Sequence, residues 1–106
     1  TRLGLAGVIA TNTTVSRSGL QTSPALVSDM GAGGLSGPVL KQRSLAVLGL
    51  LRANLPSSMA VVSVGGVFSA ADVLERLALG ATLVQGYTGF VYEGPLWARK
   101  INRGLI

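Results

Sequence analysis

Val62-Ser-Val-Gly-Gly-Val67 and Leu83-Val-Gln-Gly-Tyr-Thr-Gly89 are two short apolar runs that end in glycine and lead toward a helical pattern. Glycine accepts positive φ angles and lets a ligand approach the backbone closely. Parallel sheets of α/β proteins bind ligands at the carboxyl ends of their strands. The two segments therefore predict two neighbouring strand ends that bind an anionic group.

Strands and helices alternate along the chain, which implies a parallel sheet. Residues 16–38 are rich in Ser, Gly, Thr and Pro and predict a long loop, either functional or disordered. In (β/α)₈ barrels the loops after the last two strands commonly hold a phosphate. The predicted fold class is therefore α/β, the C-terminal part of a TIM (β/α)₈ barrel with about three βα units. We expect strands over residues 3–10, 59–64 and 81–85, helices over 39–55, between Ser69 and Gly80 and from Pro95 onward, and an irregular piece after Gln85.

Side-chain spacing predicts the buried face of each helix. Ser69, followed by Asp72 three positions later, predicts a weaker form of the capping box. Gly65 and Gly66, followed by the helix that Ser69 caps, would together present free N–H groups to an anion. The basic side chains expected in solvent are Arg17, Lys41, Arg43, Arg99, Lys100 and Arg103. The expected inner stripes are Leu40, Val47, Leu48, Leu51 and Leu55, then Val73, Leu74 and Leu77, and finally Trp97, Ile101 and Leu105.

Length and composition indicate a piece of a larger fold. A complete (β/α)₈ barrel needs roughly 200 residues or more, and this chain has 106. Apolar residues make up 48% and charged residues 12%, whereas a small free-standing domain exposes much surface and should be more polar. The chain starts at Thr1 and stops at Ile106 in mid-pattern. We therefore expect residues 1–106 to be one partial barrel domain of a longer protein.

The net charge of +5 comes with no Cys and no His. The basic residues form no run and no aromatic-interleaved RNA signature occurs, so we expect no nucleic-acid partner. An anion-binding surface and scattered solvated cations are both compatible with the charge. The absence of Cys excludes disulfides, and without His a zinc site is not expected either. No run of 18 apolar residues occurs, so the chain predicts no membrane-spanning helix.

Thr11-Asn-Thr-Thr14 follows the first predicted strand. Asn offers amide donors and a carbonyl acceptor, and each Thr hydroxyl does both, which suits a planar imide or carboxylate. A turn that satisfies its own backbone explains the same residues. The glycine-rich segment Gly31–Gly37 is compatible either with a cradle for a phosphate or flavin edge or with a flexible lid.

Gly66, together with Tyr87 and Thr88, predicts a phosphate grip made from two loops. A tight βα turn at the glycines is the structural alternative. Ser16, Ser18 and Ser36 are nucleophiles by residue type alone, and no G-x-S-x-G elbow occurs. Without His no Ser-His-Asp arrangement forms. The residues thus predict part of a binding site and no catalytic acid or base in this segment.

Four segments, in this order, closely resemble the C-terminal portion of the class 2, quinone-dependent dihydroorotate dehydrogenases. Each motif is weak alone, and the ordered set is specific. The resemblance covers almost the whole chain. The segments are Ile9-Ala-Thr-Asn-Thr-Thr-Val-Ser-Arg17, Gly33-Gly-Leu-Ser-Gly37, Val62-Ser-Val-Gly-Gly66 and Gly80-Ala-Thr-Leu-Val-Gln-Gly-Tyr-Thr-Gly89.

The resemblance implies roles for the matching positions. Asn12 and Thr13 would hydrogen-bond the ring of the substrate dihydroorotate or the product orotate. The cofactor FMN would be contacted by Thr11, Gly37, Gly66, Tyr87 and Thr88. The serine base of the family, a flavin-contacting lysine and the N-terminal helical segment that meets membrane and quinone match nothing in this chain.

The implied activity is FMN-dependent oxidation of dihydroorotate to orotate with quinone as electron acceptor, in pyrimidine (UMP) biosynthesis. It would take place in a peripheral membrane protein, on the cytoplasmic face of a bacterial membrane or on the mitochondrial inner membrane. The isolated segment is expected to be inactive and to self-associate. Two alternatives stay open, a phosphate-binding TIM-barrel lyase or isomerase and a truncated, non-catalytic FMN- or phosphate-binding module.

Overall fold

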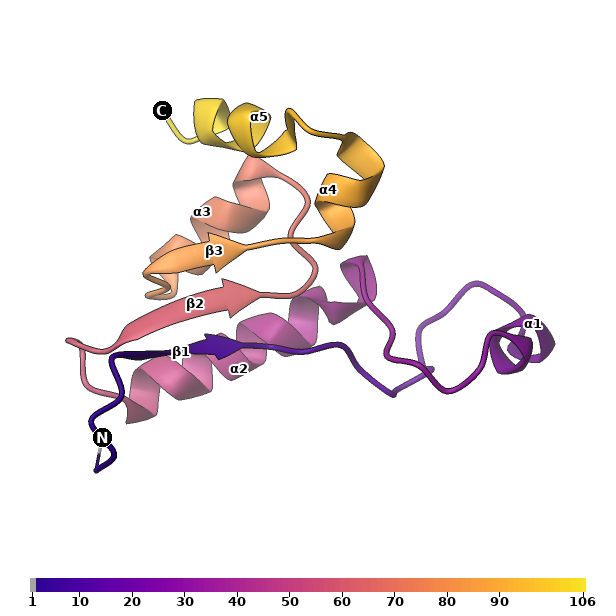
Figure 1. Cartoon of the computed structure of the whole chain (residues 1–106), viewed down its shortest axis with the longest axis horizontal. Coiled ribbons are helices and arrows are strands. Elements are labelled where there is room, and N and C mark those ends of the chain that lie inside the picture. The colour runs from indigo at the N-terminus through magenta and orange to yellow at the C-terminus, as the bar shows by residue number, and fades with distance from the viewer. Residues whose placement is uncertain (1) are drawn as a thin grey trace.

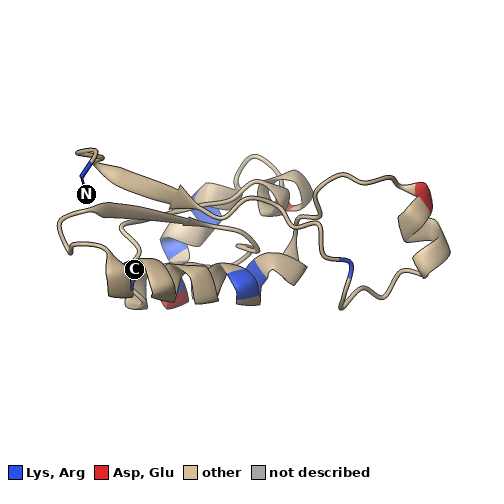
Figure 2. Ribbon diagram, turned by 90° about the horizontal axis from the view of Figure 1, so that it is seen from below, with Lys and Arg blue, Asp and Glu red and all other residues tan. Residues whose placement is uncertain are grey.

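The computed structural model describes residues 2–106 as one parallel sheet with its longer helices on one face, and with a loop and a short helix that extend away from the sheet (Figures 1 and 2). A two-layer shape of 46 × 35 × 18 Å results. The strands are β1 (Gly7–Ala10), β2 (Ala60–Val64) and β3 (Leu83–Gln85). The helices are α1 (Pro24–Asp29), the 3₁₀ turn η1 (Pro38–Leu40), α2 (Lys41–Asn54), α3 (Ala70–Ala78), α4 (Thr88–Glu93) and α5 (Trp97–Gly104).

The strand order is β1-β2-β3, and both pairings are parallel. The register aligns Ile9 with Val62 and Val62 with Leu83, so these three side chains share one face. The alternate residues Val61 and Ser63 are buried on the other face, under the helices. Ile9 is 66% exposed and Leu83 64% exposed. Within residues 2–106 the sheet therefore has one uncovered apolar face and two unpaired edges.

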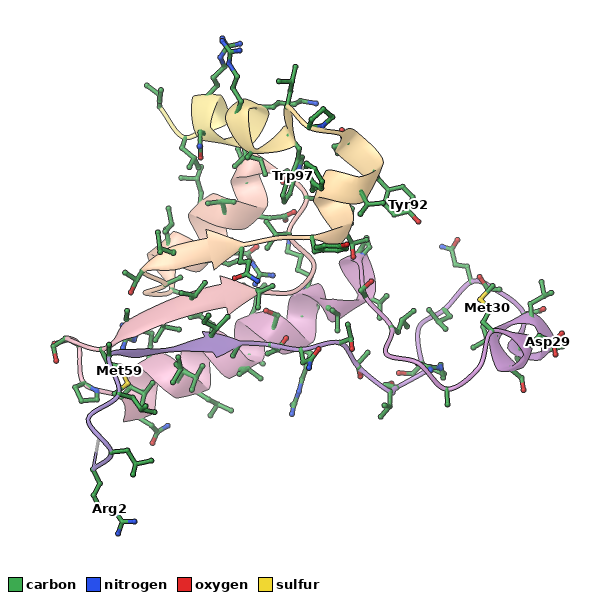
Figure 3. All side chains as sticks on the ribbon, viewed as in Figure 1. Arg2, Asp29, Met30, Met59, Tyr92 and Trp97 are labelled. Atoms are coloured by element: carbon green, nitrogen blue, oxygen red, sulfur yellow. The ribbon has the colours of Figure 1, made fainter. Side chains whose placement is uncertain are left out.

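A cluster of apolar side chains joins α3 and α5 next to the sheet. It consists of Val67, Val73, Trp97 and Ile101, with Val84 and Leu105 packed against it. The indole of Trp97 lies between α5 and α4 (Figure 3) and its Nε1 donates a hydrogen bond to the carbonyl oxygen of Phe68 at 2.9 Å. This cluster confirms the predicted stripe of the last helix and fixes the chain that follows β3.

Helix α2 covers β1 and β2. Leu40 and Leu48 of the predicted stripe are buried, and Val47, Leu51 and Leu55 are half-buried. Ser44, which spacing did not select, is 1% exposed. None of the helices in residues 2–106 is both long and apolar enough to cross a membrane.

The strands and the loop differ in extent from the prediction. Strand β1 starts at Gly7 because its partner β2 starts at Ala60, directly opposite. The long loop contains the short helix α1, which begins with a proline that is compatible with the first helical turn. The segment predicted as irregular contains α4, whose six residues are too few for a periodic signal. The order of strands and helices is otherwise as predicted.

The predicted inner stripe of α3 is wrong in two of its three positions. Leu74 is 49% exposed and Leu77 39% exposed, and only Val73 is buried. Arg76 faces inward in their place and is fully buried. Its guanidinium finds oxygen acceptors in α2 and β2, and hydrogen bonds of this kind are what allow a charged group to be buried.

Two glycines provide a matched test of this packing. A Cβ at Gly86 would lie 2.3 Å from the indole Cη2 of Trp97, whereas a Cβ at Gly49, in the middle of α2, would meet nothing within 4 Å. We expect Gly86→Ala to lower the free energy of unfolding by about 1–3 kcal/mol through overpacking. Gly49→Ala should raise it by about 0.5–1 kcal/mol, because Ala is the better helix former. Chemical denaturation measures the free energy of unfolding of both variants. Equal changes in the two variants would contradict the packing of Gly86 against Trp97.

Candidate functional site

The carboxyl ends of the three strands open into one cavity of about 570 Å³. The ends of β1, β2 and β3 all contribute to its wall, as do Ser36 and Gly37 from the glycine-rich segment. The structure thus brings together the two strand ends from which the sequence argument started. All seven residues that the resemblance assigned to ligands line this cavity: Thr11, Asn12, Thr13, Gly37, Gly66, Tyr87 and Thr88.

Thr11 ties the end of β1 to the end of β2. Its backbone N–H donates to the carbonyl oxygen of Val64 at 2.8 Å, and its hydroxyl donates to the same oxygen at 3.3 Å. Asn12 and Thr13, which follow, are exposed to the cavity. The Oδ1 of Asn12 accepts the N–H of Thr13 at 2.8 Å. The turn predicted as the structural alternative, in which a side chain bonds its own backbone, is therefore present, and it uses the side-chain carbonyl oxygen of Asn12.

The turn after β2 admits only glycine. Gly65 and Gly66 have φ angles of 121° and 74°, a region that side chains disfavour. A Cβ at Gly66 would lie 2.6 Å from the backbone nitrogen of Lys41. Within residues 2–106 the N–H of Gly66 donates to no backbone acceptor. The turn thus brings an N–H group without a partner to the wall of the cavity.

The segment after β3 meets the glycine-rich segment across the cavity. Thr88 Oγ1 donates to Ser36 Oγ at 2.9 Å. Gly37 is buried with a φ of 100° and lies close to Thr88, because a Cβ there would be 3.8 Å from the threonine methyl group. Tyr87 is 78% exposed. The N–H of Thr88 opens α4 and has no acceptor within that helix, as for any first helical residue.

The loop between β1 and η1 is folded back on itself. Thr14 and Leu35 exchange backbone hydrogen bonds of 3.0 and 2.7 Å. The guanidinium of Arg17 donates to the carbonyl oxygens of Thr14 and Gly33. Arg17 is therefore a half-buried cross-link of the loop, in addition to its predicted exposure to solvent. These contacts carry Ser36 and Gly37 to the cavity.

The start of α3 is capped by side chains of the chain itself. The Ser69–Asp72 pair forms a complete capping box, and Asp72 Oδ2 also accepts the N–H of Phe68 at 2.9 Å. The carboxylate of Asp72 thus takes the N–H groups of Phe68 and Ser69, which precede the helix, and anion binding at this helix start stays a prediction. The glycine turn and the chain after β3 also bring residues to this end of the sheet, where they line the cavity.

Lys41 was predicted to lie in solvent, but it forms ion pairs with two carboxylates of α3. Its Nζ lies 2.9 Å from Asp72 Oδ1 and 3.3 Å from Glu75 Oε2. Hydrogen bonds to these carboxylates raise the pKa of Lys41. Burial alone would raise the pKa of Asp72, but the bonds from Lys41 and from two backbone N–H groups outweigh it and lower that pKa. The positive charge of Lys41 is thus already neutralised.

The cavity wall is neutral. Among residues 2–106 it includes no Asp, Glu, Lys or Arg, and no group of three metal-ligating side chains occurs. Hydroxyl, amide and backbone N–H groups are its polar atoms. Such a wall binds and orients a ligand, and offers no carboxylate or imidazole to move a proton. Gln85, at the end of β3, also lines it. Gln85 was not selected from the sequence, although its position at the end of a predicted strand, directly before Gly86, could have indicated it.

The sequence model of the family "Dihydroorotate dehydrogenase" matches residues 1–106. This chain belongs to the dihydroorotate dehydrogenase family. It is 66% identical over 103 residues to "Dihydroorotate dehydrogenase (quinone)" of Leifsonia xyli, covering 97% of this chain and 30% of that protein. It is 62% identical over 106 residues to the protein of that name from Clavibacter michiganensis, covering 100% of this chain and 31% of that protein. The chain therefore spans about 30% of the length of these relatives.

Solved dihydroorotate dehydrogenases have the same fold over this segment. The DHODH of Eimeria tenella in complex with ferulenol matches with a TM-score of 0.87 and 34% identity, over 98% of this chain and 27% of that chain. The ligand-free enzyme of that organism matches with a TM-score of 0.86. The predicted fold class, an α/β piece of a TIM barrel, is confirmed, and so is the predicted resemblance to the family.

The lowered pKa of Asp72 gives the stability of this family member a pH dependence with a defined sign. A carboxyl group whose pKa is lower in the folded than in the unfolded state stabilises the fold above its unfolded pKa of about 4. That contribution is lost as the pH falls through the lower, folded value. We expect Asp72→Asn to reduce the free energy of unfolding at pH 7, and the difference from the original protein to shrink below pH ~4.

Denaturant titrations between pH 7 and pH 3 measure this difference. Asp29→Asn, in the exposed helix α1, is the matched control and should leave the free energy of unfolding unchanged at each pH. A deficit of Asp72→Asn that stays constant across the whole range would contradict the ion pair with Lys41.

Proposed function

We propose that residues 1–106 are the C-terminal part of a (β/α)₈-barrel enzyme that oxidises dihydroorotate to orotate with FMN, passes the electrons to quinone, and so serves pyrimidine (UMP) biosynthesis. The observation that carries this proposal is the single cavity at the three strand ends, lined by all seven residues that match the family's ligand contacts. Relatives of this chain bear the name dihydroorotate dehydrogenase (quinone), which supports the substrate and the electron acceptor.

The residues present fit the phosphate end of FMN. A dianion needs several N–H or hydroxyl donors and no nearby carboxylate, and the cavity wall has this composition. At Gly66 the backbone itself reaches the wall, where any Cβ would collide with Lys41. We assign FMN contacts to Gly66, Tyr87 and Thr88 at its phosphate and to Thr11 and Gly37 elsewhere. When bound, FMN supplies the redox chemistry by accepting a hydride equivalent.

Asn12 and Thr13 are the proposed contacts to the dihydroorotate or orotate ring. Both side chains are exposed at the cavity, directly after β1. The internal bond to Oδ1 leaves the amide NH₂ of Asn12 to donate to a carbonyl of the ring. These residues bind and orient the substrate. We place the base that removes its proton outside this segment, so the segment alone is inactive.

Quinone and the membrane would be met by other parts of the full-length enzyme, which we propose to be a peripheral membrane protein. The alternatives, a phosphate-binding lyase or isomerase and a non-catalytic phosphate- or FMN-binding module, make different predictions for the full-length protein. Neither a lyase nor an isomerase of that kind shows the absorbance bands of oxidised flavin. A non-catalytic module would show no turnover of dihydroorotate with quinone. Flavin absorbance together with turnover excludes both.

Asn12→Ala tests the substrate contact in the full-length dehydrogenase. Loss of one hydrogen bond to a buried ligand costs about 1–3 kcal/mol, so kcat/KM for dihydroorotate should fall about 5- to 150-fold. FMN content should be unchanged. Asn54→Ala is the matched control, because Asn54 only caps a carbonyl in α2 at 2.8 Å and lies outside the cavity. Loss of flavin with unchanged substrate kinetics would contradict the role of Asn12.

The isolated segment should self-associate. The uncovered face with Ile9 and Leu83, together with the two unpaired sheet edges, is the kind of surface that pairs with other chains. We expect residues 1–106 alone to elute as oligomers in size-exclusion chromatography with light scattering, and to lack dehydrogenase activity. A compact, stable monomer would contradict this expectation.

A further inference from the structure

We propose that Arg76 is a positioning residue for cofactor binding: its buried guanidinium orients the Gly65–Gly66 peptide so that the N–H of Gly66 faces the cavity and binds the phosphate of the cofactor. This inference rests on the proposed function and adds a residue that does not itself touch the ligand. Arg76 does not line the cavity, and the sequence argument placed Leu74 and Leu77 on the inner face of α3 in its stead.

Arg76 is a buried cation without a carboxylate partner. Its exposed fraction is 0%, and both recorded salt bridges of residues 2–106 use Lys41 instead. One terminal nitrogen of Arg76 donates to Ser44 Oγ at 2.8 Å and to Ser63 Oγ at 2.7 Å. Burying a charge on neutral partners is costly, and an apolar side chain would fill the same space without that cost. The reason for an arginine at this buried position must therefore lie in the groups that its hydrogen bonds hold in place.

The other terminal nitrogen of Arg76 donates to the carbonyl oxygen of Gly65. That carbonyl belongs to the same peptide unit as the N–H of Gly66. In a trans peptide the C=O and N–H groups point in opposite directions, and the only cis bond in residues 2–106 is Ala10–Thr11. Because Arg76 draws the carbonyl toward the core, the N–H of Gly66 is directed away from the core. Gly66 lies on the cavity wall.

The same contacts hold the neighbouring peptide in place. Ser44, which accepts from Arg76, donates its own hydroxyl to the carbonyl oxygen of Val64 at 2.7 Å. The guanidinium thus links α3 to α2 and to the end of β2. Both Gly65 and Gly66 have positive φ angles, and glycine costs more conformational entropy to fix than any other residue. The network explains how this turn keeps one orientation.

Charge adds to orientation. Burial lowers the pKa of Arg76, while the carboxylates of Asp72 and Glu75 raise it, and a guanidinium stays protonated in proteins. A hydrogen bond from a cation polarises the peptide that accepts it, so the N–H at its other end becomes a stronger donor. No acidic side chain lines the cavity in residues 2–106. The positive charge behind the turn is therefore felt by an anion in front of it.

The test compares FMN with riboflavin, which has the same ring system and lacks the phosphate. The full-length dehydrogenase is stripped of flavin, and the dissociation constants of both ligands are measured by flavin fluorescence. The variants are Arg76→Met and Arg76→Lys. Arg52→Met is the matched control, because Arg52 also holds backbone carbonyls, of Pro56 and Met59 at 3.0 Å each, and lies away from the cavity.

We expect Arg76→Met to weaken FMN about tenfold or more, the factor for one hydrogen bond to a charged group, and to leave riboflavin nearly unchanged. Arg76→Lys, which keeps the charge on one donor group, should restore part of the preference for FMN. Arg52→Met should keep the whole preference. If Arg76→Met does not fold, Ser63→Ala, which removes one partner of the guanidinium, should lower the preference by a smaller factor.

Other outcomes overturn the proposal. Equal weakening of FMN and riboflavin in Arg76→Met would show a purely structural role for Arg76. An unchanged preference in Arg76→Met, or in Ser63→Ala where Arg76→Met does not fold, would show that the turn is oriented without Arg76. Failure of the unsubstituted enzyme to bind FMN more tightly than riboflavin would instead refute the proposed phosphate site, and with it the proposed function.

Discussion

The carbonyl oxygen of Val64 is the point on which this structure depends. It accepts the N–H of Thr11 at 2.8 Å and the hydroxyl of Ser44 at 2.7 Å. These two bonds join the ends of β1 and β2 and fasten both to α2. Parallel pairing alone brings strand ends to one edge of a sheet, but it does not set the direction of the chain beyond that edge. The junction at Val64 does so for Thr11 and, through the glycine turn, for Gly66.

The two cations near the cavity, Lys41 and Arg76, differ in whether a carboxylate pairs with them. Lys41 lies beside the glycine turn, yet its charge is met by Asp72 and Glu75. Arg76 has no such partner and bonds only to hydroxyl and carbonyl oxygens. Figure 2 shows the basic residues scattered along the ribbon, without a continuous run. An anion at the strand ends would therefore meet neutral donors directly, with the cationic guanidinium of Arg76 behind them.

Most of the fold could be predicted from local sequence signals. The glycine-ended strands, the Ser69 cap and the spacing of Trp97 and Ile101 each depend on neighbours within a turn or a strand, and each is confirmed. Helices α1 and α4 could not be predicted, because six residues carry no measurable period. Their formation depends on a proline start in one case and on docking beside Trp97 in the other.

The candidate site was predicted from strand ends and glycines together with the family resemblance, and the roles of its residues stay predictions. The seven candidate positions are contiguous with strand ends or glycines, and the structure gathers all of them at one cavity. The contacts of Arg17, which is half-buried, and of Arg76, which is fully buried, were not predictable, because their acceptors are distant along the chain. Arg17 donates to Gly33, which lies 16 residues away along the chain, and Arg76 donates to Ser44, which lies 32 residues away. Patterns of apolar spacing place such a residue in solvent by default.

The uncovered apolar face of the sheet is explained if this chain is one part of a closed barrel. Ile9 and Leu83 are as exposed as surface residues but are apolar like a core, and the relatives are about three times longer than the matched segment. In a closed barrel this face points inward, against side chains from the other strands. In such a barrel the ligand contacts and the catalytic residues come from the ends of several different strands. Three strands therefore supply only some of them. A proton-moving group can therefore lie across the barrel from Asn12, which would make the described cavity one wall of the site.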